Sequence, residues 1–182
     1  MKNTIQNSIK SFVVLSFLLI SSAWADQKNL KVYVTLFPAG DFIAETNDIT
    51  GAAELVSPTE VKAKDIKINL KSLKTGMETR DDHAKNKYLE VQKFPEAILI
   101  SAIGKNGKGA GVLKIHGKET KVDGTYTLVD NNKFLKAVFK TKLSSFDIKE
   151  INYKGIGVDD EIKVEITVPV AASAPATVKP KK

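Results

Sequence analysis

Apolar and polar residues alternate along many short stretches of this chain, which is the pattern of β-strands with one buried face. The alternation is unbroken over residues 30–36 and again over residues 162–170. Further stretches between these two bring the number of predicted strands to roughly eight. They cover residues 42–46, 61–70, 98–102, 113–116, 120–129 and 135–143.

Turn residues separate these stretches, and only one interval has room for a helix. Phe37-Pro38-Ala39-Gly40 and Asp130-Asn131-Asn132 are typical of tight turns. Between Leu73 and Val91 the two-residue period stops, and Thr79 followed by Arg80, Asp81 and Asp82 resembles a helix start. We therefore predict about two turns of helix from Thr79 to Tyr88.

One helix is too few for a parallel sheet, because parallel strands need a crossover connection between them. The chain is therefore predicted to be all-β, as an antiparallel eight-stranded barrel or a sandwich with one short helical excursion. The interior of an eight-stranded barrel is either filled by side chains or holds one small apolar ligand. Sequence periodicity does not distinguish these two cases. The residues predicted to point inward would be core residues in a filled barrel and cavity-lining residues in a hollow one. They are Val32, Val34, Phe42, Ile66, Ile68, Ile100, Tyr126, Phe139, Val164 and Ile166.

The first 25 residues have the features of a secretory signal peptide. Lys2 and Lys10 precede an apolar run over residues 12–20, and Ala23-Trp24-Ala25 ends the segment with small residues on either side of a tryptophan. The apolar run is too short for a membrane span, which needs about twenty residues. We expect a periplasmic or secreted protein that is not a transmembrane protein after cleavage. The folded domain is predicted over residues 26–170, and a disordered Ala/Pro/Lys tail over residues 171–182.

The charge of the whole chain suggests nucleic-acid binding, but its distribution does not. The formal net charge is +7 over 182 residues. Five of these charges lie outside the predicted domain, on two lysines of the signal segment and three lysines of the tail. The nearly balanced remainder excludes the concentrated basic face that a nucleic-acid partner requires.

The residue types for catalysis are scarce. The chain has no cysteine and two histidines, so a thiolate nucleophile and a cysteine-bound metal are excluded. No Gly-x-Ser-x-Gly elbow occurs, and the paired carboxylates Asp81-Asp82 and Asp159-Asp160 are adjacent rather than separated across a cleft. We expect no enzyme, no resident cofactor and no metal. His116 follows Lys114 on one strand face and is expected to point outward.

Arg80 is the only arginine of the chain and lies at the start of the predicted helix. A guanidinium grips a carboxylate or phosphate with two hydrogen bonds, and His83 falls on the same helix face. Arg80, His83 and Asp82 are therefore candidates for contact with the polar end of a ligand. The alternative is structural, with Arg80 paired to Asp81, Asp82 or a backbone carbonyl and His83 held within the fold.

Several motifs resemble the YceI-like family. The segment from Thr75-Gly76 through Arg80-Asp81-Asp82-His83 to Phe94-Pro95 matches its central motif. Residues 111–118 resemble its glycine-flanked hairpin, and residues 144–148 with 157–162 resemble its closing segment. The resemblance spans residues 30–170 and implies a lipocalin-like barrel with an elongated apolar cavity. It also implies secreted or periplasmic proteins that bind polyisoprenoids or other long apolar chains, often as homodimers.

The sequence and the resemblance together favour a carrier or scavenger of a long apolar molecule, such as an isoprenoid, a quinone or another lipid. One alternative is a structural or stress-response interaction domain with a filled barrel and no ligand. Another is a metal-dependent enzyme that uses His83.

We predict that the exported protein begins at Asp26, because signal peptidases cut after small residues such as Ala25. N-terminal sequencing and intact mass of the exported protein test this cleavage. A product that keeps Met1 and remains with the membrane would indicate an uncleaved interfacial helix instead.

Overall fold

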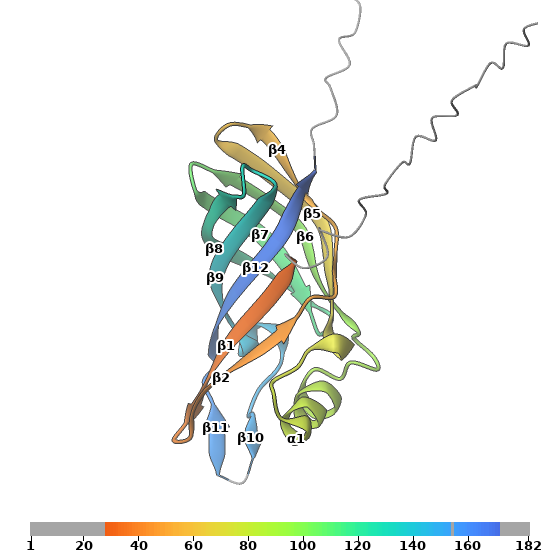
Figure 1. The fold of residues 1–182 in the computed structure, drawn as a ribbon. Helices are drawn as coiled ribbons and strands as arrows, with labels where there is room; N and C mark the ends of the chain where they lie inside the picture. Colours follow the sequence, from red (N-terminus) through yellow and green to blue (C-terminus); the bar gives the residue numbers. More distant parts are fainter. Residues whose placement is uncertain (1–27, 154, 172–182) are drawn as a thin grey trace, which may run out of the picture.

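The computed structural model describes residues 28–153 and 155–171, which form one continuous sheet of 12 strand segments (Figure 1). The strands are β1 (Asn29–Phe37), β2 (Gly40–Thr46), β3 (Ile49–Thr50), β4 (Ala53–Ser57), β5 (Glu60–Asn69), β6 (Glu96–Lys105), β7 (Lys108–Ile115), β8 (Lys118–Val129), β9 (Phe134–Lys142), β10 (Asn152–Tyr153), β11 (Ile156–Val158) and β12 (Glu161–Ala171).

The sheet closes on itself through β12. Strands β4 to β9 follow one another in order, and β12 pairs with both β9 and β4, so seven strands make a closed ring. Strand β1 also pairs with β12, and β2, β10 and β11 extend the sheet from β1. The prediction of an all-β barrel is confirmed. The predicted count of eight strands is not matched, since seven strands form the ring and five further segments extend the sheet. The prediction that all strands are antiparallel is wrong, because β12 and β4 run parallel over their two residue pairs.

The parallel pair arises because residues 40–57 form three strand segments, β2, β3 and β4, that do not all pair with the same neighbour. Strand β2 pairs with β1, whereas its continuations β3 and β4 pair with β5. Since β2 and β12 are both antiparallel to β1, the continuation of β2 into β4 runs in the same direction as β12. Gly51 lies at the last break with φ of 101°, and a Cβ there would be 3.1 Å from the Ile66 Cα.

The helical excursion lies at one end of the barrel, beside β10 and β11 (Figure 1). It consists of α1 (Glu78–Asp82) followed by a π-helical turn (His83–Tyr88). The predicted helix from Thr79 to Tyr88 is therefore confirmed, with a start one residue earlier. The Leu89 amide closes the π-helical turn by donating to the Ala84 carbonyl at 2.8 Å.

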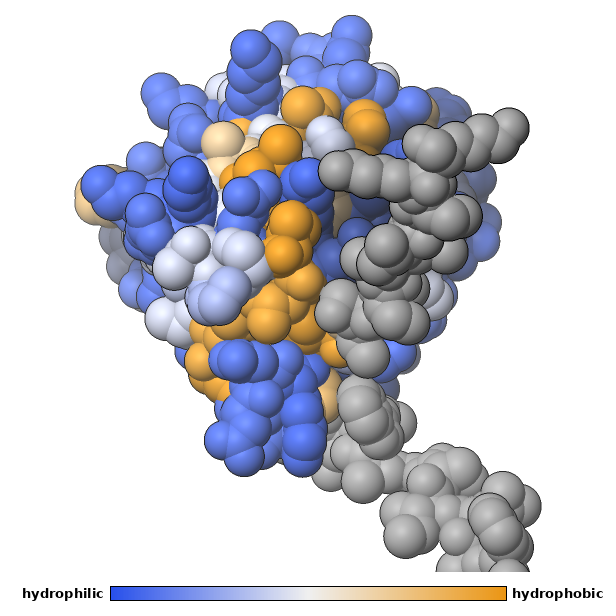
Figure 2. Space-filling model, turned by 90° about the horizontal axis from the view of Figure 1, so that it is seen from above, coloured by the Kyte–Doolittle hydropathy of each residue, from blue (hydrophilic) through white to orange (hydrophobic). Residues whose placement is uncertain are grey.

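The opposite end of the barrel carries the hairpin of β4 and β5. Figure 2 views the molecule from this end, where hydrophilic side chains surround a strip of apolar ones that reaches the surface. Ile103 of β6 and Val56 of β4 are 58% and 49% exposed. Apolar residues are thus not confined to the interior.

Some sequence-based expectations fall outside the described residues. The predicted signal segment 1–25 does so entirely, and the predicted tail 171–182 does so except for Ala171, which is the last residue of β12. In the part of the chain that the structure describes, no helix has the length and apolar character needed to cross a membrane.

Gly124 of β8 gives a test of the barrel packing. A Cβ at this position would collide with the Val138 carbonyl oxygen and lie 2.8 Å from the Phe139 Cβ. We predict that Gly124→Ala lowers the free energy of unfolding by about 1–3 kcal/mol, as overpacking does.

Gly157→Ala is the matched control, since nothing lies within 4 Å of a Cβ there. Urea unfolding measures both variants. Equal stability of the two would show that β8 and β9 are not in close contact at Gly124.

Candidate functional site

The half of the barrel next to the helix is hollow. A cavity of about 450 Å³ lies between the inward residues of the strands and the helical excursion. Most of its wall is aliphatic, from residues such as Leu30 and Val34 of β1, Ala44 of β2 and Ala97 of β6. Its polar members are Thr75, Thr79, Arg80, His83, Tyr88 and Thr141.

The size of the inward side chains explains the hollow. The strands of a closed barrel fix the interior diameter, and medium or large side chains are needed to fill it. In this half the wall is built mainly from alanine, valine, leucine and isoleucine, with Phe42, Tyr88 and Phe139 as its aromatic members. These side chains cover the wall without meeting in the middle.

The predicted inward residues divide between this cavity and a smaller one. The residues in the wall of the large cavity are Val32, Val34, Phe42, Ile68, Phe139, Val164 and Ile166. Ile66 and Tyr126 line the smaller chamber instead. Ile100 lines neither, because the register of β6 against β7 shifts between Leu99 and Ser101 and takes Ile100 out of the inward row.

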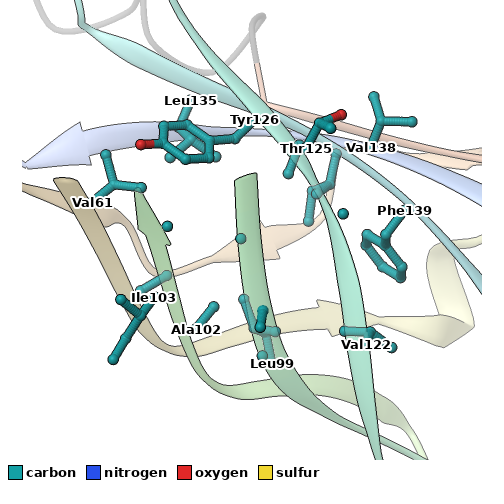
Figure 3. Close-up of a pocket in the computed structure, with 18 of the residues that line it drawn as sticks. Val61, Leu99, Ala102, Ile103, Val122, Thr125, Tyr126, Leu135, Val138 and Phe139 are labelled. Carbon is teal, nitrogen blue, oxygen red and sulfur yellow. The ribbon is translucent and has the colours of Figure 1, made fainter. Parts of the chain in front are cut away.

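The smaller chamber, of about 100 Å³, lies farther along the barrel (Figure 3). Tyr126 covers its far side, and the Tyr126 hydroxyl donates to the Thr59 carbonyl oxygen at 2.9 Å, in the turn between β4 and β5. Gly104 makes room for the ring, since a Cβ there would be 2.5 Å from the Tyr126 Cε1. Tyr126 thus narrows the end of the barrel that is remote from the helix.

Arg80 lies in the wall of the large cavity, and no carboxylate of the described residues is paired with it. Its guanidinium stacks over the Phe42 ring at 4.3 Å from the centroid. Its other polar contact is weak, from Nη2 to the Met77 sulfur at 4.0 Å. Among residues 28–153 and 155–171 no ion pair to Arg80 is formed, so the predicted alternative of a bridge to Asp81 or Asp82 is not observed.

Asp81 is bound to Thr75 rather than to Arg80. One Asp81 carboxylate oxygen accepts hydrogen bonds from the Thr75 backbone N–H and from the Thr75 hydroxyl, both at 2.7 Å. Burial raises the pKa of Asp81, but the two hydrogen bonds and the nearby Lys85 and Lys74 outweigh this and leave the pKa below 3.8. These two hydrogen bonds, called here the Thr75–Asp81 tie, close the loop before α1 and fix the positions of Arg80 and His83.

A second tie of the same kind lies in the closing motif. The two Asp160 carboxylate oxygens accept from the Ser144 N–H and the Ser144 hydroxyl, each at 2.7 Å. These hydrogen bonds lower the pKa of Asp160 below 3.8. The sequence analysis did not predict the hydrogen bonds of Asp81 with Thr75 or of Asp160 with Ser144. The one sequence feature that could have indicated them is a hydroxyl residue before an acidic residue in each motif.

The other two candidates for contact with a polar ligand end are separated. His83 lies in the cavity wall beside Arg80, whereas Asp82 is exposed and is not part of the wall. Within the described part of the chain, no three histidine, aspartate or glutamate side chains come together as a metal site would require. The structure therefore brings Arg80 and His83 together at the cavity and leaves Asp82 outside it.

His116 does not point outward as predicted. Its side chain is only 16% exposed, and its Nε2 lies 2.9 Å from a Glu90 carboxylate oxygen. Its ring packs edge-on against Phe94 at 4.5 Å between centroids. His116 adopts φ of 51° at the end of β7, which turns its side chain away from the direction that strand alternation predicts.

Comparison with known proteins identifies the family and the fold. The family model of the YceI-like domain matches residues 25–170. None of the curated proteins matches the sequence.

Two solved structures share the architecture. BcnA from Burkholderia cenocepacia has a TM-score of 0.58 and 16% identity, over 78% of this chain and 96% of that chain. A polyisoprenoid binding domain from Saccharophagus degradans, implicated in plant cell wall breakdown, has a TM-score of 0.56 and 10% identity, over 79% of this chain and 93% of that chain. At such identities the likeness concerns the fold.

The Thr75–Asp81 tie predicts a difference between two adjacent aspartates. Asp81→Asn removes the charge that accepts both hydrogen bonds and is expected to lower the free energy of unfolding by about 1 kcal/mol at neutral pH. Since the pKa of Asp81 is lowered in the folded state, this stabilisation is present above pH 3.8 and is lost as the pH falls below it.

Asp82→Asn is the control, because Asp82 is exposed and makes neither of these hydrogen bonds. Urea unfolding at several pH values, from neutral to about pH 3, follows the difference. An Asp81→Asn effect that persists unchanged at acid pH would contradict the role of the carboxylate charge.

Proposed function

This chain belongs to the YceI-like domain family, and we propose that it binds one long apolar molecule, such as an isoprenoid, a quinone or another lipid, inside the barrel. The observation that carries the proposal is the cavity of about 450 Å³ with its aliphatic wall. Its volume falls within the range of about 300–1,000 Å³ that is common for small-molecule sites.

Burial supplies most of the affinity in this proposal. Each enclosed methylene contributes about 0.8 kcal/mol. With about 30 Å³ for each carbon, the volume per molecule of liquid water, the cavity holds roughly fifteen carbons. An apolar chain of this length gains enough from burial to remain bound through extensive dilution.

The polar end of the ligand lies at Arg80 and His83. Both residues belong to the helical excursion and line the cavity where it meets the strands. The Phe42 ring packs against one face of the Arg80 guanidinium. Among the described residues, the guanidinium forms no ion pair. A carboxylate, phosphate, hydroxyl or quinone oxygen fits this position, because a guanidinium offers several N–H donors.

The binding role extends to transport or scavenging outside the cytoplasm. The features of residues 1–25 support export, and the polyisoprenoid-binding domain of Saccharophagus degradans supports an apolar chain as ligand. The alternative of a filled barrel without a ligand disagrees with the observed cavity.

Native mass spectrometry of the mature protein from its own compartment tests the proposal. We predict a discrete adduct of several hundred daltons that is lost on extraction with organic solvent and is identified in the extract. The same spectrum reports whether the protein is the predicted homodimer.

A pair of variants on the helical excursion makes the test specific to the cavity. Ala84 lies in the cavity wall, so Ala84→Phe is expected to abolish the adduct by filling the space. Asn86 is exposed on the same π-helical turn, so Asn86→Phe is expected to retain it. A wild-type protein of bare mass, or an adduct that survives in both variants, would argue against binding in this cavity.

A further inference from the structure

We infer that Phe139 is the floor of the large cavity and sets the length of the apolar chain that the protein accepts. The inference rests on the proposed function and deepens it, because it concerns which ligands the same cavity selects.

The two cavities meet at a single layer of the barrel. Leu99 of β6, Phe139 of β9 and Ile166 of β12 line both of them. Along β9 the inward row passes from Leu135 and Ala137 in the small chamber, through Phe139, to Thr141 in the large cavity. The change of chamber therefore occurs at Phe139.

A second strand gives the same boundary. Along β12 the row passes from Val168 in the small chamber, through Ile166, to Val164 and Ile162 in the large cavity. Val164 is the strand partner of Phe139. Two adjacent strands thus change from one chamber to the other at neighbouring levels, as expected for a layer of side chains across the barrel.

Phe139 is the bulkiest member of this layer and is fixed at its base. Gly124 is its partner on β8, and the absence of a side chain there lets the Phe139 Cβ pack directly against the neighbouring backbone. Figure 3 shows Phe139 and Tyr126 on opposite sides of the small chamber. A space of about 100 Å³ therefore lies on the side of the Phe139 ring that faces away from the large cavity.

Removal of the ring would join the chamber to the large cavity. The additional volume accommodates at least about three carbons when about 30 Å³ is assigned to each. Tyr126 limits any further extension, because its hydroxyl is held by Thr59.

The experiment measures affinity against chain length. Saturated fatty acids shorter and longer than roughly fifteen carbons are titrated into delipidated mature protein, with direct native mass spectrometry as readout. In the wild type, affinity is expected to rise with length and then level off. In Phe139→Ala the rise is expected to continue for about three further carbons, by roughly fourfold per carbon.

Leu135→Ala is the matched control. Leu135 lines only the small chamber, so its truncation enlarges that chamber and leaves the floor in place. The length at which affinity levels off is expected to remain that of the wild type. Phe139→Leu keeps an apolar side chain at the floor and is expected to give a smaller shift, so the inference can be tested even if Phe139→Ala does not fold.

The outcomes separate this inference from the proposed function. If the wild type binds no fatty acid of any length, the inference fails. The proposed function fails with it only if the protein from its own compartment also has a bare mass. If the wild type binds fatty acids but Phe139→Ala and Phe139→Leu level off at the wild-type length, only the inference fails. An equal shift in Leu135→Ala would also overturn it, since the limit would then not lie at Phe139.

Discussion

Closure of the barrel by β12 is the constraint on which the rest of the structure depends. This strand pairs with β9 along most of its length, with β1 on its other side and with β4 at its end. Backbone hydrogen bonds therefore fix the diameter of the interior before any side chain is considered. Whether the interior is filled or hollow then depends only on the volumes of the inward side chains at each level.

Those volumes differ between the two ends. Near the β4–β5 hairpin, Tyr126 occupies the interior because Gly104 leaves space for its ring. Near the helical excursion the inward residues are mainly aliphatic, and the helix covers the barrel without filling it. One barrel therefore has a small chamber beside the packed Tyr126 ring at one end and a large cavity at the other.

The motif carboxylates hold the structure around the hollow. Asp81 binds Thr75 and Asp160 binds Ser144, each through a backbone N–H and a hydroxyl. Because Asp81 is engaged in this way, Arg80 remains without an ion pair among the described residues and faces the cavity beside Phe42. The acidic residues next to Arg80 in the sequence therefore serve the architecture, and the guanidinium is left for another partner.

The sequence by itself determined the all-β class, the long strands and the helical excursion, because a two-residue period and its interruption at Leu73 are local properties of the chain. It also indicated most of the inward residues. Tertiary structure alone decided that Ile100 leaves the inward row, that Asp81 binds Thr75, that His116 packs against Glu90 and Phe94, and that half of the barrel is hollow. Each of these depends on distances between residues of different strands or loops, and periodicity carries no information about such distances.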